Sequence, residues 1–188
     1  MNPQADVKVA ARQPAATRVK PIFIVGVPRS GTTLLVNLIG LHPQLAPIFE
    51  TRFLRNLLQH CEYASWYWST ARSRRLLSLF GETLLRSRFT ARCEAYRAKI
   101  ISFHSSRDFS NGRRSELPFD RQIVLYTCDE LVKETDRWIG NLLSGPVPES
   151  QVYGEARKLV GALFSLHSAR MDKPYWVNKT PGLLTELR

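Results

Sequence analysis

The sequence predicts an α/β fold in which helices flank a parallel sheet, a phosphate-binding loop (P-loop) follows the first strand, and a large block of helices is inserted. Three short apolar runs, at 22–25, 45–49 and 175–178, suit buried parallel strands, which are covered on both faces. A glycine-containing loop separates the first run from a helical pattern. From about 53 to 171, apolar residues recur mostly at three- and four-residue spacing, which is typical of helices.

The first half of the predicted sheet precedes this helical block. Ile22–Val25 predicts a buried strand, and Thr32–Leu41 predicts a helix that ends at His42-Pro43. Leu45–Phe49 predicts an extended segment or an edge strand, because Pro47 cannot donate a hydrogen bond to a neighbouring strand. We expect the apolar residues of the helix to form its inner face: Leu34, Leu35, Leu38, Ile39 and Leu41.

The inserted block divides into several helices. Apolar spacing predicts helices near Phe53–Cys61, Tyr67–Arg86, Thr90–Phe103, Pro118–Leu143 and Glu149–Met171. The composition predicts loops at 105–112 and 144–148. Beyond the block, Tyr175–Asn178 predicts the third strand, and a turn follows it.

The composition predicts a globular chain with an anionic partner. Its 188 residues suit one domain or part of a larger one, and 44% hydrophobic residues are enough for a core. The net charge of +11 attracts nucleic acid, anionic lipid and phosphorylated ligands alike, and a solvated basic surface explains it equally well. No run of about 20 apolar residues occurs, so the sequence predicts no membrane span.

The cysteines and the first residues bear on the compartment. Cys61, Cys93 and Cys128 lie far apart and form no Cys/His cluster, so we expect no metal site. Their odd, sparse count fits a reducing compartment, and we expect a cytoplasmic protein. Residues 1–20 lack the apolar segment of a secretory signal, and we expect a flexible tail there.

The loop at 26–33, G-V-P-R-S-G-T-T, has the setting of an anion site. It follows a strand and opens a helix, so backbone N–H groups and the positive end of the helix converge on it. A nucleoside triphosphatase has lysine after the second glycine, but here that position is Thr32 and the cation is Arg29, inside the loop. We expect these residues to bind a phosphate-bearing ligand: Pro28, Arg29, Ser30, Gly31, Thr32 and Thr33.

These residues carry a family resemblance. P-R-S-G-T-T-L-L after F-I-V-G-V resembles the 5′-phosphosulfate loop of the sulfotransferases that use 3′-phosphoadenosine 5′-phosphosulfate (PAPS), and within them the tyrosylprotein-sulfotransferase-like and bacterial branch. The resemblance implies that Arg29 neutralises charge on the leaving oxygen. Glu50-Thr51-Arg52, after His42-Pro43, is similar to the stretch that carries the catalytic base of that branch, which implies Glu50 as base. The segment N-K-T-P resembles the family's N-K-[TD]-P, which implies that Lys179 lies close to the transferring sulfuryl group.

The order of the elements supports one site without the resemblance. Arg29, Glu50 and Lys179 each follow a predicted strand, and parallel strands bring their carboxyl ends to one edge, where α/β proteins bind ligands. A base must reach the acceptor hydroxyl, and an ammonium suits developing negative charge. The competing interpretations are a surface Glu50 at the start of a helix and an ordinary strand-end Lys179.

The resemblance implies a sulfotransferase that moves a sulfuryl group from PAPS to a hydroxyl acceptor and releases 3′-phosphoadenosine 5′-phosphate (PAP), without metal or nucleic acid. The family's 3′-phosphate motif, R-D-x-R followed by Ser, would lie beyond Lys179 and is not found. Arg107–Ser110 looks similar but precedes Lys179. We therefore expect residues 21–188 to be the N-terminal part of a sulfotransferase domain with an incomplete sheet.

Two other functions stay open on the sequence alone. A kinase-like nucleotide-binding enzyme would need lysine in place of Thr32 and a downstream aspartate for Mg²⁺. A basic helical module for nucleic acid or membranes would use Arg72–Arg75 and Arg113-Arg114 with the aromatic residues 66–68, although helix surface and core packing explain these residues too. The second alternative leaves the loop at 26–33 without a role.

Overall fold

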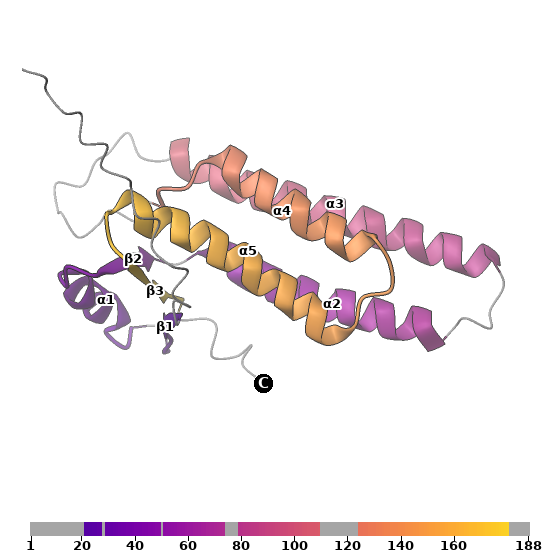
Figure 1. The fold of residues 1–188 in the computed structure, drawn as a ribbon, viewed down its shortest axis with the longest axis horizontal. Helices are drawn as coiled ribbons and strands as arrows, with labels where there is room; N and C mark the ends of the chain where they lie inside the picture. Colours follow the sequence, from indigo (N-terminus) through magenta and orange to yellow (C-terminus); the bar gives the residue numbers. More distant parts are fainter. Residues whose placement is uncertain (1–20, 28, 50, 74–78, 110–123, 181–188) are drawn as a thin grey trace, which may run out of the picture.

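The computed structural model describes residues 21–27, 29–49, 51–73, 79–109 and 124–180 of the chain. Within these ranges it contains a three-stranded sheet and five helices, and it confirms the predicted α/β fold (Figure 1). The elements in chain order are β1 (Ile22–Ile24), α1 (Thr32–Gly40), β2 (Leu45–Phe49), α2 (Arg52–Ser73), α3 (Leu79–Phe109), α4 (Cys128–Leu143), α5 (Glu149–Arg170) and β3 (Tyr175–Lys179).

The sheet is parallel, and its last strand along the chain is its central one. The spatial order is β1-β3-β2, with both outer strands parallel to β3. As predicted, the Pro47 strand lies at an edge, where its missing N–H costs no ladder bond. One face of the sheet packs on α1 through the cluster of Ile24, Val36, Phe49 and Val177, and the other packs on α5. The sheet, whose strand ends are the predicted place of the ligand site, therefore lies between two helical layers.

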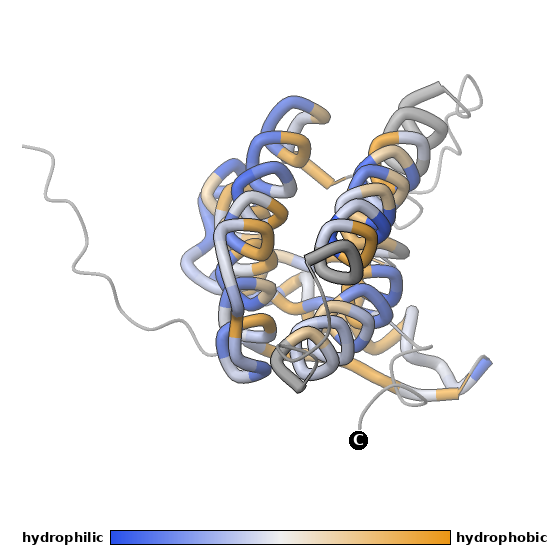
Figure 2. Tube along the Cα trace, turned by 90° about the vertical axis from the view of Figure 1, so that its right-hand side faces the viewer, coloured by the Kyte–Doolittle hydropathy of each residue, from blue (hydrophilic) through white to orange (hydrophobic). Residues whose placement is uncertain are grey.

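Helices α2 to α5 form a four-helix bundle that extends from the sheet. Each helix runs antiparallel to the next along the chain, and α2 also contacts α5, so the bundle closes (Figure 1). Figure 2 looks along the bundle, and hydrophobic and hydrophilic residues alternate around its helices. The large hydrophobic core fills the bundle and reaches the sheet at Ala46, Ile48 and Trp176.

The helix boundaries inside the bundle differ from the predictions. The predicted helix Tyr67–Arg86 was wrong, because α2 ends at Ser73 and α3 begins at Leu79. The predicted loop at 105–112 was wrong up to Phe109, where α3 ends. Ser and Asp lower helix propensity only modestly, and a long helix already packed on its neighbours tolerates them. The predicted loop at 144–148 is confirmed between α4 and α5.

The bundle core contains a buried histidine among aromatic rings. The His60 ring stacks on Tyr96 with centroids 4.7 Å apart, and its Nε2 lies 3.4 Å from the Cys93 sulfur. Burial raises the pKa of both Cys61 and Cys93 to about 12. These cysteines therefore stay protonated and act as packing residues rather than nucleophiles.

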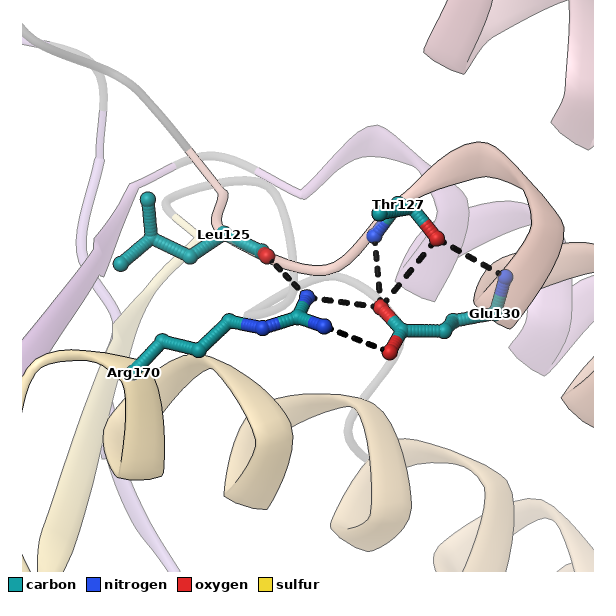
Figure 3. A network of polar contacts seen from close by, with 4 residues as sticks. All are labelled: Leu125, Thr127, Glu130 and Arg170. Carbon is teal, nitrogen blue, oxygen red and sulfur yellow. Dashed lines mark hydrogen bonds and ion pairs between the residues drawn. The ribbon is translucent and has the colours of Figure 1, made fainter.

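A polar network joins the start of α4 to the end of α5 (Figure 3). Thr127 and Glu130 form a capping box, in which the Thr127 hydroxyl accepts from the Glu130 N–H and the Glu130 carboxylate accepts from the Thr127 N–H. Arg170 donates to both carboxylate oxygens of Glu130 at 2.7 Å and also to the Leu125 carbonyl. Arg170 and the Thr127 N–H hold the pKa of Glu130 well below its usual range, so the pair stays ionised.

Two side chains attach the bundle to the sheet layer. The Nε2 of His167 donates to the Pro47 carbonyl in β2 at 3.1 Å, while its Nδ1 accepts from the Leu125 N–H. The ammonium of Lys173, after α5, donates to the carbonyls of Gly40, His42 and Leu45 at 2.8, 3.1 and 2.9 Å. Lys173 thereby supplies the cation at the carboxyl end of α1, whose last turn has no basic residue.

The inner face predicted for α1 was wrong at its four leucines and is confirmed at Ile39. Leu34, Leu35, Leu38 and Leu41 are 47–70% exposed, while Val36 is buried and Ile39 is partly buried against the sheet. The helix is apolar nearly all round, so its sequence does not distinguish the side that meets the sheet. Among the described elements, nothing covers the leucine side of α1, and β1 has a strand partner on one side alone.

Protonation of the buried histidines should weaken the fold. Burial and Arg92 lower the pKa of His60 from 6.5 to about 4, and burial lowers that of His167. Because the unfolded chain binds these protons first, the stabilisation is complete above pH 6.5 and is lost as the pH falls toward 4. We expect His60 to lower the free energy of unfolding by about 2–3 kcal/mol between about pH 7 and about pH 4.5 in urea titrations.

The variant His60→Gln isolates this contribution, because glutamine does not titrate. It should be less stable near neutral pH, yet lose less stability on acidification by about 2 kcal/mol. An equal acid loss in both proteins would show that His60 does not titrate with a depressed pKa.

Candidate active site

The carboxyl ends of the three strands lie side by side. Lys179, the last residue of β3, is in register with Ile24, the last residue of β1, and with Phe49, the last residue of β2. Of the three predicted catalytic positions, Lys179 is itself a strand end, Arg29 lies in the loop after β1, and Glu50 follows Phe49 in the sequence. Glu50 and Pro28 lie outside the described residues, but Phe49 and Thr51 on either side of Glu50 are both buried.

The loop after β1 has a backbone that suits an anion. Arg29 and Gly31 both have positive φ, 69° and 77°, and Ser30 between them does not. Alternating signs of φ turn successive N–H groups toward one side and form a concave anion site. The loop also folds tightly over its first residue, because a Cβ added at Gly26 would lie 2.7 Å from Ser30 Oγ and 2.8 Å from Thr32 Cγ2.

The start of α1 adds further donors. Leu35 donates to the Gly31 carbonyl at 3.0 Å, which leaves the N–H groups of residues 32–34 without partners in the helix. The cap residue Gly31 provides no side-chain hydrogen bond, and the first turn contains no acidic residue. Three side chains at the loop and the first turn of α1 are exposed: Arg29, Ser30 and Thr33. The loop and helix start together fit a phosphate or sulfate group.

Lys179 stands beside this loop on the same face of the sheet. Side chains alternate along a strand, so Lys179 shares the face of Val177, which packs on α1 with Ile24 and Phe49. Lys179 is 4% exposed. A buried ammonium needs compensating interactions, and Lys179 takes part in one within the protein.

Asn178 is a residue to which the sequence analysis assigned no role. It is fully buried in β3, on the bundle face with Trp176. Its amide nitrogen donates to Thr51 Oγ1 at 3.2 Å and to the Ile48 carbonyl at 3.4 Å, and its oxygen accepts from the Thr180 hydroxyl at 2.7 Å. The available signal was a polar residue directly after the apolar run Tyr175–Val177 and next to Lys179.

A family model described as the sulfotransferase family matches residues 21–187. The chain belongs to the sulfotransferase family. Searches of the curated proteins and of the solved structures found no match. The matched range includes the loop after β1, the four-helix bundle and β3 with Lys179, so the bundle is part of the sulfotransferase region rather than a separate module.

The other features considered in the sequence analysis are the basic and aromatic patches, a metal site and a membrane span. Tyr67 stacks on Phe89 with centroids 4.1 Å apart, so it serves the bundle core rather than a nucleic acid. Arg74, Arg75, Arg113 and Arg114 lie outside the described residues. No three His, Cys, Asp or Glu side chains gather to hold a metal in the part of the chain that the structure describes. None of the described helices is long and apolar enough to cross a membrane.

Replacement of Gly26 should damage the anion loop specifically. In Gly26→Ala the new methyl group displaces Ser30 or Thr32, the side chains expected to donate to the phosphate. We expect the dissociation constant of PAP to rise at least tenfold, about 1.4 kcal/mol, by calorimetry.

Gly161→Ala in α5 is the matched control, because a Cβ there meets nothing within 4 Å. It should leave PAP affinity unchanged and stabilise the helix slightly. Equal PAP affinity in Gly26→Ala and the unmodified protein would contradict the loop as the anion site.

Proposed function

We propose that this sulfotransferase transfers a sulfuryl group from PAPS to an acceptor hydroxyl and releases PAP. The observation that carries the proposal is the alignment of the three strand ends, with an anion-binding loop and the buried Lys179 on the same face of the sheet. Family membership supports sulfuryl transfer in general. The donor and the roles of individual residues are our inference.

The loop residues fit the phosphosulfate end of the donor. Pro28, Arg29, Ser30, Gly31, Thr32 and Thr33 follow β1 in the proposed binding segment. Backbone N–H groups and the hydroxyl groups would bind the phosphate oxygens, and the Arg29 guanidinium would neutralise their charge. The donor supplies an activated sulfuryl group when it is bound there.

Three side chains then divide the chemistry. The Glu50 carboxylate accepts the proton of the acceptor hydroxyl while the acceptor oxygen forms a bond to sulfur. The bond between sulfur and the phosphate oxygen breaks, and its electron pair stays on PAP. Lys179 and Arg29 stabilise the negative charge that develops on this leaving oxygen, which is where fixed cations lower the barrier most.

The alternatives explain fewer of the observations. A kinase-like enzyme would use a lysine after Gly31, where this chain has Thr32. A basic helical module would use the aromatic residues 66–68, of which Tyr67 is buried in the bundle and Trp66 is 56% exposed, but it leaves the loop at 26–33 without a role. Neither alternative predicts a match to sulfotransferases over residues 21–187.

The proposal extends to the domain organisation. We propose that residues 21–188 are the N-terminal part of the sulfotransferase domain. Two features of the described residues support a sheet that continues past β1: four leucines on α1 are 47–70% exposed, and β1 pairs with β3 alone. Activity should therefore be assayed in the whole polypeptide that the gene encodes.

Replacement of the proposed base should separate catalysis from binding. We expect Glu50→Gln to lower kcat for sulfuryl transfer from labelled PAPS by about 100-fold or more, because general base catalysis is lost. PAP affinity should change little, since the carboxylate meets the acceptor and not the donor.

Arg29→Ala should instead weaken PAP binding about tenfold or more, because a charge-assisted contact is removed.

Glu62→Gln is the matched control, since Glu62 is an exposed residue of α2. It should leave kcat and PAP affinity unchanged. A Glu50→Gln protein with the kcat of the unmodified enzyme would contradict Glu50 as the base. Failure of PAPS to donate to any hydroxyl in an acceptor panel would contradict the proposed reaction.

A further inference from the structure

Asn178 uses its whole side chain to connect three segments. Both of its polar atoms are hydrogen-bonded: the nitrogen to Thr51 and Ile48, and the oxygen to Thr180. Asn178 is 0% exposed and Thr51 is 2% exposed, so water does not compete for these bonds. A buried amide with all these partners holds its neighbours in one arrangement.

The segments connected by Asn178 are the ones that lead into the proposed site. Thr51 and Ile48 lie on either side of the end of β2. Thr180 follows β3, and its backbone N–H donates to the carbonyl of Ile24, the last residue of β1, at 3.2 Å. One side chain therefore fixes the spacing of all three strand ends, directly for β2 and β3 and through Thr180 for β1.

We propose that Asn178 is a positioning residue for sulfuryl transfer, which acts by holding the ends of β2 and β3 at a fixed separation. This inference rests on the proposed function. In sequence, Glu50 stands between Phe49, which pairs with Lys179, and Thr51, which Asn178 binds. Both chain neighbours of the proposed base are thereby tied to the strand that carries the proposed cation.

The energetic reason lies in the edge position of β2. This strand is five residues long, contains Pro47 and, among the described strands, pairs with β3 alone. Its end would otherwise be held to the sheet mainly by the last pairs with β3. Because misplacement of a reacting group by about 1 Å costs about 100-fold in rate, loss of this clamp should appear in kcat.

The partner threonine gives a test that spares the central strand. Thr51→Val keeps the shape of the side chain and removes the oxygen that accepts from Asn178. We expect kcat to fall about 10- to 100-fold, with the KM for PAPS unchanged within about threefold, because the anion loop follows a different strand. Thr51→Ser, which retains the hydroxyl, should restore most of the lost rate.

Thr135→Val in α4 is the matched control. Thr135 is equally buried, and its hydroxyl has no hydrogen-bond partner among the described residues. This variant should keep the kcat of the unmodified enzyme.

In the double variant Asn178→Ala/Thr51→Val, kcat should be within about twofold of Asn178→Ala alone if both changes break the same contact.

The outcomes separate this inference from the proposed function. If Arg29→Ala loses PAP binding and Glu50→Gln loses transfer while Thr51→Val keeps its kcat, the positioning role is refuted and the sulfotransferase proposal stands. A fall in kcat that Thr51→Ser does not reverse also refutes it, since the hydroxyl is then not the cause. If PAPS is no donor, both proposals fail together.

Discussion

The parallel register of the three strands is the constraint on which the rest of the structure depends. It places Ile24, Lys179 and Phe49 in one row, so that the segments after β1, β2 and β3 begin at the same edge. Residues about 130 positions apart, such as Lys179 and Phe49, become neighbours through backbone hydrogen bonds. The anion loop needs this frame, because a loop with exposed donors has little packing of its own.

The four-helix bundle lies between β2 and β3 in the sequence, yet the two strands pair directly in the sheet. The bundle extends away from the sheet, and the four described helices between β2 and β3 run alternately out and back, so that the chain returns to the sheet where β3 begins. His167 and Lys173 then attach the returning chain to β2 and to the end of α1. The helices of the bundle pack on one face of the sheet, and α1, which follows the proposed anion-binding loop in the sequence, packs on the other.

Local sequence patterns predicted the strands and the loop after β1, but not how the helices pack on their neighbours. The strands and the loop around Arg29 were predictable, because β-branched runs and a glycine loop are local signals. The exposed leucines of α1 and the continuity of α3 through 105–109 were not, since neighbouring elements decide them. Asn178 stood in a recognised motif, but its role needs the long-range partner Thr51. The roles of Arg29, Glu50 and Lys179 stay predictions.

A crystal structure of the whole polypeptide with PAP tests the central claim most directly, that the edge formed by the three strand ends binds the donor. We expect the 5′-phosphate of PAP within hydrogen-bond distance of the backbone N–H groups of residues 31–33, with the Lys179 ammonium on the same side of the sheet. PAP bound away from this edge, with the loop after β1 making no contact to it, would contradict the account.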